Sequence, residues 1–137
     1  ICHGDFRADN LMFDDADESE DGIAVLDWQI CFRGPAVTDV TYLLCQSMTV
    51  EQRRAAEDDL VRSWYEGLVD ECGAADDYPF DLAWQQYQRG TLGATVYPVT
   101  AMGAMDPANE RGRELVAAMA VRAFTAALDH DAARFLA

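Results

Sequence analysis

The sequence predicts a mainly α domain with one small β-hairpin. Two short apolar runs, Leu11–Phe13 and residues 23–26, flank an acidic stretch that ends in Gly22, which is the pattern of two strands joined by a turn. Beyond Pro35, apolar residues recur at three- and four-residue spacing, as on the buried face of a helix. Half of the 137 residues are hydrophobic, and no repeat or linker interrupts the chain. We therefore expect one domain over residues 1–137.

The first two helices are predicted from their boundaries. One helix should follow Pro35 and end near residue 48. Thr49 is then a suitable N-cap for the next, because its hydroxyl can accept a backbone hydrogen bond while Gln52, three residues on, completes a capping box. Gly73 supplies the glycine at which helices commonly stop. The second helix should therefore fill most of the interval between Thr49 and Gly73.

Two further helices are expected toward the C-terminus. The third should run from about residue 81 toward Tyr97, after which Pro98 should bend or end it. Asp106 followed by Pro107 should open the fourth, because a capping residue before proline is a common helix start. The apolar stripes that we expect to face the core are Val37, Val40, Leu44 and Met48 in the first helix, Leu60, Val61, Trp64, Leu68 and Cys72 in the second, and Leu115, Met119, Ala123, Phe124 and Leu128 in the fourth.

The acidic turn of the expected hairpin has some features of a calcium-binding loop. Asp15, Asp17 and Ser19 have the spacing of the first ligands of an EF-hand. An EF-hand also needs Gly at the sixth position and Glu at the twelfth, and these positions hold Glu20 and Leu26. We therefore expect a solvated hairpin tip and no calcium site.

The chain is strongly acidic, with a formal net charge of −15 at pH 7. Such a surface repels nucleic-acid phosphates and anionic lipids, so we expect neither nucleic acid nor a membrane as a partner. It would tolerate a cationic substrate or a divalent metal. No apolar run reaches the roughly 18 residues of a membrane span, and no signal peptide is visible. The four cysteines form no C-x-x-C pair and lie in segments that we expect to be buried, which favours a reducing, cytoplasmic location.

Three residues have a spacing typical of phosphoryl transfer. This reaction needs a carboxylate to accept the proton of the attacking hydroxyl, and oxygen ligands for Mg²⁺ at the ATP phosphates. In kinase-like enzymes one loop supplies an Asp and, five residues later, an Asn, and a second Asp follows the next strand. Asp5, Asn10 and Asp27 have this spacing, and the hairpin would return Asp27 to the side of the first loop. We predict Asp5 as the catalytic base and Asn10 and Asp27 as metal ligands.

The residues around this pattern resemble a known superfamily. They are His3-Gly4-Asp5, Asn10-Leu11-Met12-Phe13, Leu26-Asp27-Trp28-Gln29, Gly34-Pro35 and Asp39-Val40-Thr41-Tyr42-Leu43. They are similar to the motifs of the aminoglycoside phosphotransferase and choline kinase-like superfamily, and Gln29 favours its ecdysteroid-kinase-like branch. The resemblance covers residues 2–46. It implies that the chain is the C-terminal, catalytic lobe of a protein-kinase-like fold, in an ATP-dependent kinase that acts on a hydroxyl of a small molecule.

Further residues acquire expected roles from this resemblance. It implies that Asp39 supports the catalytic loop by hydrogen bonds, and we expect His3 to be structural in the same way. Arg7 is expected either to touch the substrate or a phosphate, or to be an exposed loop side chain. Gly4 occupies the place where protein kinases carry an Arg that pairs with a phosphorylated activation loop. We therefore expect a small-molecule substrate and no activation by loop phosphorylation.

The sequence does not contain every part of a kinase. The phosphates of ATP are normally covered by a Gly-rich loop and paired with a strand Lys. The chain has no Lys, since all ten of its basic residues are Arg. We therefore expect an N-terminal ATP-binding lobe upstream of Ile1, and we expect the chain to be inactive without it.

Two other functions remain open. The chain could be a catalytically silent binding or scaffold domain built on the same lobe, although Asp5, Asn10 and Asp27 argue against this. A metal-dependent hydrolase would need a denser set of His and carboxylate ligands, and His130 is the only histidine besides His3.

The sequence does not identify the acceptor. The acidic charge suits a cationic alcohol such as an aminoglycoside or choline, whereas Gln29 favours the steroid-kinase-like branch. Some aromatic side chains could line the acceptor pocket, but at helical spacing most should belong to the core; they are Trp64, Tyr65, Trp84, Tyr87 and Tyr97.

Overall fold

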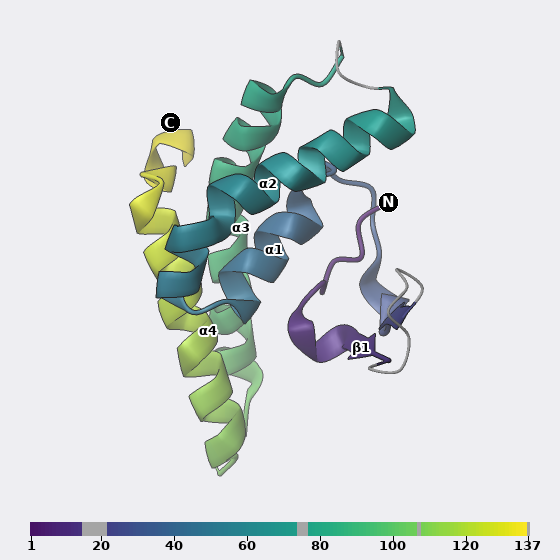
Figure 1. Ribbon diagram of the computed structural model, residues 1–137. Coiled ribbons are helices and arrows are strands. Elements are labelled where there is room, and N and C mark those ends of the chain that lie inside the picture. The colour runs from purple at the N-terminus through teal and green to yellow at the C-terminus, as the bar shows by residue number, and fades with distance from the viewer. Residues whose placement is uncertain (15–21, 74–76, 107, 137) are drawn as a thin grey trace.

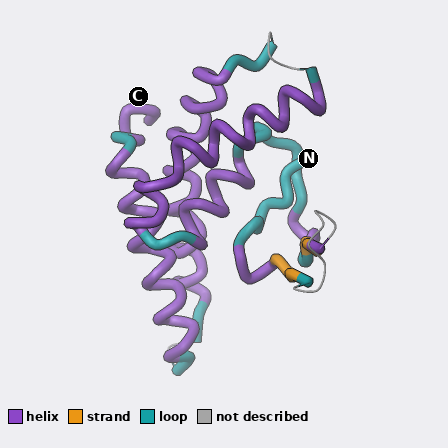
Figure 2. Tube along the Cα trace, in the orientation of Figure 1, coloured by secondary structure: helices purple, strands orange, loops and turns teal. Residues whose placement is uncertain are grey.

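The computed structural model describes residues 1–14, 22–73, 77–106 and 108–136, which form a bundle of four helices with a small hairpin at its side (Figure 1). In chain order the elements are η1 (Ala8–Asn10), β1 (Leu11–Phe13), β2 (Ile23–Val25), η3 (Trp28–Ile30), α1 (Thr38–Ser47), α2 (Val50–Cys72), α3 (Phe80–Ala104), α4 (Glu110–Asp129) and η4 (Ala132–Leu136). Helix accounts for most of the chain, as Figure 2 shows. The predicted class, mainly α with a small β-hairpin, is confirmed.

The helices pack around the pair α3 and α4, which run side by side. Helix α1 lies against both of them, and α2 crosses over the bundle (Figure 1). The N-terminal segment and the hairpin lie beside α1, on the side away from α4 in this view. Helix α1 therefore separates the hairpin from the rest of the bundle and is placed to support the segment that carries the predicted site.

The predicted hairpin is present. Strands β1 and β2 are antiparallel, with Leu11 opposite Val25 and Phe13 opposite Ile23. The acidic turn expected to be a solvated tip lies at residues 15–21, outside the described residues. A second antiparallel contact joins Cys2 to Phe32, through hydrogen bonds of 2.7 and 3.0 Å, and ties the N-terminal segment to the chain beyond the hairpin.

The predicted boundaries of α2 are confirmed. The Thr49 hydroxyl accepts a hydrogen bond from the Gln52 backbone N–H at 3.2 Å, and the Gln52 side chain accepts one from the Thr49 N–H at 3.0 Å. This is the complete capping box. At the other end Gly73 has a left-handed conformation with φ of 62°, and its N–H donates to the carbonyl of Val69.

Helix α3 continues through Pro98 to Ala104, so of the two predicted effects of this proline, a bend or an end, the end is wrong. Proline has no N–H, so within a helix it leaves the carbonyl four residues earlier without its usual partner. Here that carbonyl belongs to Ala94, and it accepts a hydrogen bond of 2.8 Å from the buried side-chain amide of Gln46 on α1. The replacement donor explains why the helix can pass through this proline.

Helix α4 begins later than predicted. Its N-cap is Asn109, whose side-chain oxygen accepts from the Gly112 N–H at 2.9 Å. Asp106, the predicted cap, instead accepts from the Ala108 N–H at 2.9 Å and forms a turn before the helix. Pro107 lies outside the described residues.

The buried faces differ in part from the predicted stripes. The predicted buried face of α1 is confirmed: Val37 and Leu44 are buried, and Val40 and Met48 pack against them. In α4, however, Leu115, Phe124 and Leu128 are exposed, and the buried residues are Val116, Met119, Ala123 and Ala126. The small residues of α4 meet Cys45 of α1 and Ala94 of α3 in one buried cluster, so the helices approach too closely there for large side chains.

Helix α2 also buries less than predicted. Of its apolar stripe only Val61 is fully buried, while Leu60 and Cys72 are exposed. The helix crosses the others instead of running along them, so it covers them with a short stretch. Cys31 is exposed as well, so the expectation that all four cysteines are buried is wrong; Cys2 and Cys45 are buried. Within the described chain, no helix combines the length and the apolar character needed to cross a membrane.

Candidate active site

The segment that carries Asp5 is held to α1 by Asp39. The Asp39 carboxylate, in the first turn of α1, accepts hydrogen bonds from the backbone N–H groups of His3 at 2.6 Å and Gly4 at 3.0 Å. From α3, the hydroxyl of Tyr97 donates to the Gly4 carbonyl at 3.1 Å. The backbone just before Asp5 is therefore fixed by two helices that are far from it in sequence.

Gly4 is required by the backbone at this point. Its φ is 89°, in the left-handed region that favours glycine, and a Cβ atom would lie 2.7 Å from the carbonyl oxygen of Ile30. A side chain would thus clash with backbone that cannot move aside cheaply. No arginine can occupy this position in the observed conformation, which accords with the difference from protein kinases noted in the sequence.

His3 links the loop to the end of the hairpin. Its ring is 1% exposed; Nδ1 accepts a hydrogen bond from the Asp5 N–H at 3.2 Å, and Nε2 lies 2.7 Å from the Leu26 carbonyl. An Nδ1 that accepts cannot carry a proton, so the proton is on Nε2 and is donated to Leu26. The ring also packs edge-on against Trp28, with centroids 4.7 Å apart. These contacts tie Asp5 to the residue that precedes Asp27.

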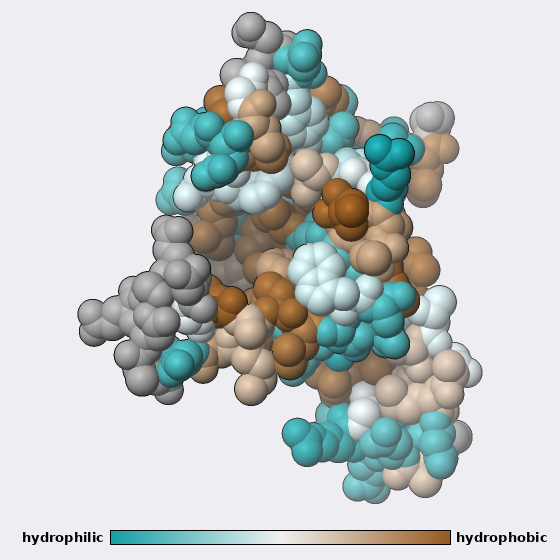
Figure 3. All heavy atoms as spheres, turned by 90° about the vertical axis from the view of Figure 1, so that its right-hand side faces the viewer, coloured by the Kyte–Doolittle hydropathy of each residue, from teal (hydrophilic) through white to brown (hydrophobic). Residues whose placement is uncertain are grey.

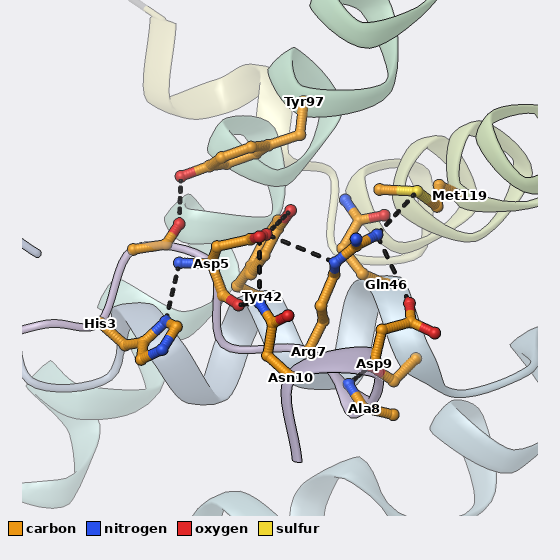
Figure 4. A network of polar contacts seen from close by, with 12 residues as sticks. His3, Asp5, Arg7, Ala8, Asp9, Asn10, Tyr42, Gln46, Tyr97 and Met119 are labelled. Carbon is orange, nitrogen blue, oxygen red and sulfur yellow. Dashed lines mark hydrogen bonds and ion pairs between the residues drawn. The ribbon is translucent and has the colours of Figure 1, made fainter. Parts of the chain in front are cut away.

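The carboxylate of Asp5 is surrounded by donors (Figure 4). Its Oδ1 accepts from the hydroxyl of Tyr42 at 2.9 Å and lies 3.6 Å from Nε of Arg7. Its Oδ2 accepts from Nδ2 of Asn10 at 3.1 Å. About a quarter of the Asp5 side chain remains exposed, so a ligand can still reach the carboxylate.

Asn10 is oriented by Asp5. Its Nδ2 donates both to the Asp5 carbonyl, at 2.8 Å, and to the Asp5 carboxylate. With the nitrogen held in this way, the amide oxygen Oδ1 faces away from Asp5. An amide oxygen is a suitable ligand for Mg²⁺, whereas an amide nitrogen is not. Asp5 and Asn10, which the sequence paired by spacing alone, are thus in direct contact.

Asp27 is placed by the hairpin. The Leu26 N–H donates to the carbonyl of Asn10 at 2.9 Å, so the pairing of the strands extends one step and sets Asp27 just past Asn10. Asp27 has a left-handed conformation, with φ of 65° and ψ of 57°, which is unusual for a residue other than glycine. Its side chain is exposed and makes no hydrogen bond within the described residues.

The three residues fit Mg²⁺ in chemistry. The Asp27 carboxylate and the Asn10 amide supply hard oxygen ligands beside the predicted base Asp5, and Mg²⁺ typically takes only one or two carboxylates from a protein, with water and phosphate oxygens completing its shell. No group of three or more His, Cys, Asp or Glu side chains suited to a metal ion occurs in the described part of the chain. A site that depends on ATP phosphates would not need such a group. Metal binding at Asn10 and Asp27 therefore stays a prediction.

Arg7 is not the exposed loop residue that was one of the two expectations. Three quarters of its side chain is buried, between Asp5 and Asp9. Its Nη1 lies 3.5 Å from the Asp9 carboxylate and donates to the sulfur of Met119 at 3.8 Å. Its Nε is buried without a hydrogen-bond partner in the described structure. Arg7 thus places a positive charge beside Asp5, and contact with a substrate or phosphate stays a prediction.

A pocket of about 550 Å³ opens beside the Asp5 carboxylate. The predicted catalytic loop (residues 3–10), α1, α3 and α4 all contribute to it, and most of the lining side chains are apolar. The lining residues are Asp5, Arg7, Ile30, Tyr42, Tyr97, Thr100, Ala101, Ala104, Met105, Leu115, Val116 and Met119. A volume of this size accommodates a small organic molecule.

A family model supports the kinase-like character of this region. The model of the ecdysteroid kinase-like family matches residues 1–76, more than half of the chain. The chain belongs to the ecdysteroid kinase-like family. No curated protein and no solved structure matches it. The matched part contains the catalytic loop, the hairpin, α1 and α2, whereas α3 and α4, which form the far wall of the pocket, lie beyond it.

Two site residues in this family member were not predicted. Tyr42 was part of the motif but had no assigned role, and Ser47 accepts a hydrogen bond from the Ala8 N–H at 2.9 Å through its hydroxyl. Tyr97 was among the aromatic residues that could line an acceptor pocket or belong to the core, and it lines the pocket beside Asp5. Tyr42 is three residues after Asp39, so once Asp39 is known to face the loop, helical spacing places Tyr42 on the same side.

Proposed function

We propose that this protein is an ATP-dependent kinase that transfers the γ-phosphoryl group to a hydroxyl of a small molecule, and that residues 1–137 are its catalytic lobe. The observation on which the proposal depends is the Asp5 carboxylate. It is partly exposed, is held by donors from two elements, contacts Asn10 and lies at the wall of a pocket. A carboxylate with a purely structural role would be expected to be closed off by its partners, whereas about a quarter of the Asp5 side chain is exposed.

The chemistry follows from these positions. An acceptor in the pocket would present its hydroxyl to Asp5, which would accept the proton as the oxygen attacks phosphorus. Oδ1 of Asn10 and the Asp27 carboxylate would hold Mg²⁺, which neutralises the charge of the β- and γ-phosphates when bound. Arg7 would add a fixed positive charge near the transferred group. Asp39 and His3 hold the backbone that presents Asp5.

The chain contains no Lys that could pair with the phosphates of ATP. We propose that an N-terminal lobe encoded upstream of Ile1 supplies the Gly-rich loop and the Lys, and that the chain alone does not turn over ATP. The hairpin and the loop after it expose large apolar side chains, on the side that faces the viewer in Figure 3. These are Met12, Phe13, Ile23, Leu26, Trp28, Ile30 and Phe32. Contact with such a lobe, and with the base of ATP, would cover them.

The pocket bears on the choice of acceptor. Its far wall is formed by Met105, Leu115 and Met119, and the cation Arg7 lies at its base. This lining suits an alcohol with an apolar body better than a polycation, despite the net charge of the chain. The four cysteines are unpaired, which fits a reducing compartment, and we propose a cytoplasmic location.

The test is an ADP-release assay on the full-length protein that contains this chain. Mg-ATP would be offered with a panel of alcohols that includes steroid, amino-alcohol and aminoglycoside acceptors. We expect acceptor-dependent ADP release that falls by about 10²- to 10⁴-fold in Asp5→Asn. Asp9→Asn is the matched control, since it makes the same change on an exposed carboxylate of the same loop. A folded protein that binds no nucleotide would contradict the proposal and favour the silent scaffold.

A further inference from the structure

Tyr42 makes the shortest hydrogen bond that reaches the Asp5 carboxylate from a different element, at 2.9 Å. We propose that Tyr42 is a positioning residue for phosphoryl transfer: its hydroxyl holds Oδ1 of Asp5 so that the carboxylate faces the acceptor pocket. This inference rests on the proposed function, in which Asp5 is the base.

The Asp5 carboxylate needs to be held because the last torsion of an Asp side chain is broad and soft. Tyr42 binds Oδ1 and Asn10 binds Oδ2, so rotation of the group would break a hydrogen bond on each side. Arg7 is too far from Oδ1, at 3.6 Å, to replace the hydroxyl. Small errors in the orientation of a base reduce the rate strongly, because the reacting atoms must lie within a few tenths of an ångström of their productive positions.

Tyr42 is itself firmly placed. Its side chain is buried and packs against the ring of Tyr97, with centroids 4.3 Å apart. It lies on the same helix face as Asp39, which holds the backbone of His3 and Gly4. Helix α1 therefore fixes both the backbone before Asp5 and the carboxylate itself.

The hydroxyl of Tyr42 also remains a donor under all ordinary conditions. Burial, followed by the hydrogen bond to Asp5, raises the pKa of Tyr42 well above its usual range. A tyrosine that stays protonated can position a carboxylate without exchanging its proton. Tyr65 provides an internal comparison, because its hydroxyl donates to the Tyr78 carbonyl at 2.8 Å and Tyr65 does not line the pocket beside Asp5.

The experiment compares Tyr42→Phe with Tyr65→Phe in the full-length protein. Both changes remove one hydrogen-bonded tyrosine hydroxyl, but only that of Tyr42 lies at the pocket beside Asp5. We expect Tyr42→Phe to lower kcat by about ten- to one-hundredfold, with the KM for Mg-ATP and the Tm close to those of the wild type. We expect Tyr65→Phe to keep kcat within about threefold of the wild type. A merely structural role would instead lower Tm and affect both variants alike.

Each outcome separates this inference from the proposed function. Activity that vanishes in Asp5→Asn but stays within about threefold in Tyr42→Phe would overturn the role of Tyr42 alone. An equal loss in the two tyrosine variants would also overturn it. A full-length protein with no acceptor-dependent ADP release would overturn the proposed function, and this inference with it.

Discussion

Two carboxylates of this protein have similar partners but different surroundings. Asp5, in the predicted catalytic loop, accepts a hydrogen bond from the hydroxyl of Tyr42 and lies near Arg7. Glu57, inside the helical bundle, receives the hydroxyl of Tyr87 at 2.7 Å and is paired with Arg53 at 2.6 Å. The chain thus uses the same set of side-chain types twice, once at an open pocket and once in the interior.

The two arginines account for the difference. Arg53 is 1% exposed and binds Glu57 and Asp129 directly, so α2 is joined to the end of α4. Arg7 stands 3.6 Å from Asp5, beyond hydrogen-bond distance. Arg53 therefore occupies the Glu57 carboxylate directly, whereas the more distant Arg7 leaves room for a further ligand at Asp5.

The carboxylates of the interior site, Glu57 and Asp129, have pKa values below their usual range. Burial alone would raise the pKa of Glu57, but hydrogen bonds from His130, Tyr87 and Arg53 outweigh it and lower the pKa to about 2. The hydrogen bond from Arg54 similarly lowers the pKa of Asp129 to about 2. A carboxylate so firmly ionised is a poor general base at neutral pH. The comparison therefore indicates a structural role for Glu57.

The largest expected effect on this comparison comes from Arg53→Met. Removing the buried cation takes away the one group among the described residues that joins Glu57 to Asp129, and we expect the free energy of unfolding to fall by about 3–5 kcal/mol. Arg54→Met is the matched control, because Arg54 is exposed and, among the described residues, its hydrogen bonds go to Asp129 alone. Urea unfolding of both variants would measure the difference. Equal losses would contradict the view that Arg53 is the centre of the interior network.

A smaller effect is expected from acid. Because the pKa of Glu57 is lower in the folded than in the unfolded state, the unfolded chain binds the proton first, and stability is lost as the pH falls from about 4.5 toward 2. Allowing for solvent screening, we expect Glu57 to account for roughly 2 kcal/mol of this loss. Urea unfolding at pH 7, 4 and 3 would show it. Glu57→Gln should have a lower stability at pH 7 and a flatter pH dependence; an unchanged slope would refute the assignment.

The smallest effect concerns the metal. In the full-length protein, Asn10→Ala should raise the Mg²⁺ concentration for half-maximal activity by about tenfold or more, because an oxygen ligand is removed. Ser47→Ala is the control, since it deletes another hydrogen bond of the same loop without touching an expected ligand. If the two variants have the same Mg²⁺ requirement as the wild type, Asn10 is not a ligand.

Local rules were enough to predict part of this structure. The capping box at Thr49, the stop at Gly73 and the hairpin pairing each depend on residues close in sequence. The spacing of Asp5 and Asn10 within one loop likewise led to residues that are in contact. Such features follow from the sequence because the partners are only a few residues apart.

Other features depend on partners that are far apart in the chain. Helix α3 passes through Pro98 because Gln46, 48 residues before Ala94, supplies the missing donor. The bond between Tyr42 and Asp5 exists because α1 lies beneath the catalytic loop. Neither contact has a local signature. The buried face of α4 could not be predicted for the same reason, since close packing with α1 and α3 selects its small residues.

The measurement that tests the account most directly compares Asp5→Asn with Glu57→Gln in the full-length protein, following kcat and Tm together. Each variant replaces a carboxylate by the amide of the same shape. We expect Asp5→Asn to lose turnover while keeping its Tm, and Glu57→Gln to lose several degrees of Tm while its folded fraction keeps its kcat. An active Asp5→Asn enzyme, or a folded Glu57→Gln enzyme that is equally inactive, would contradict it.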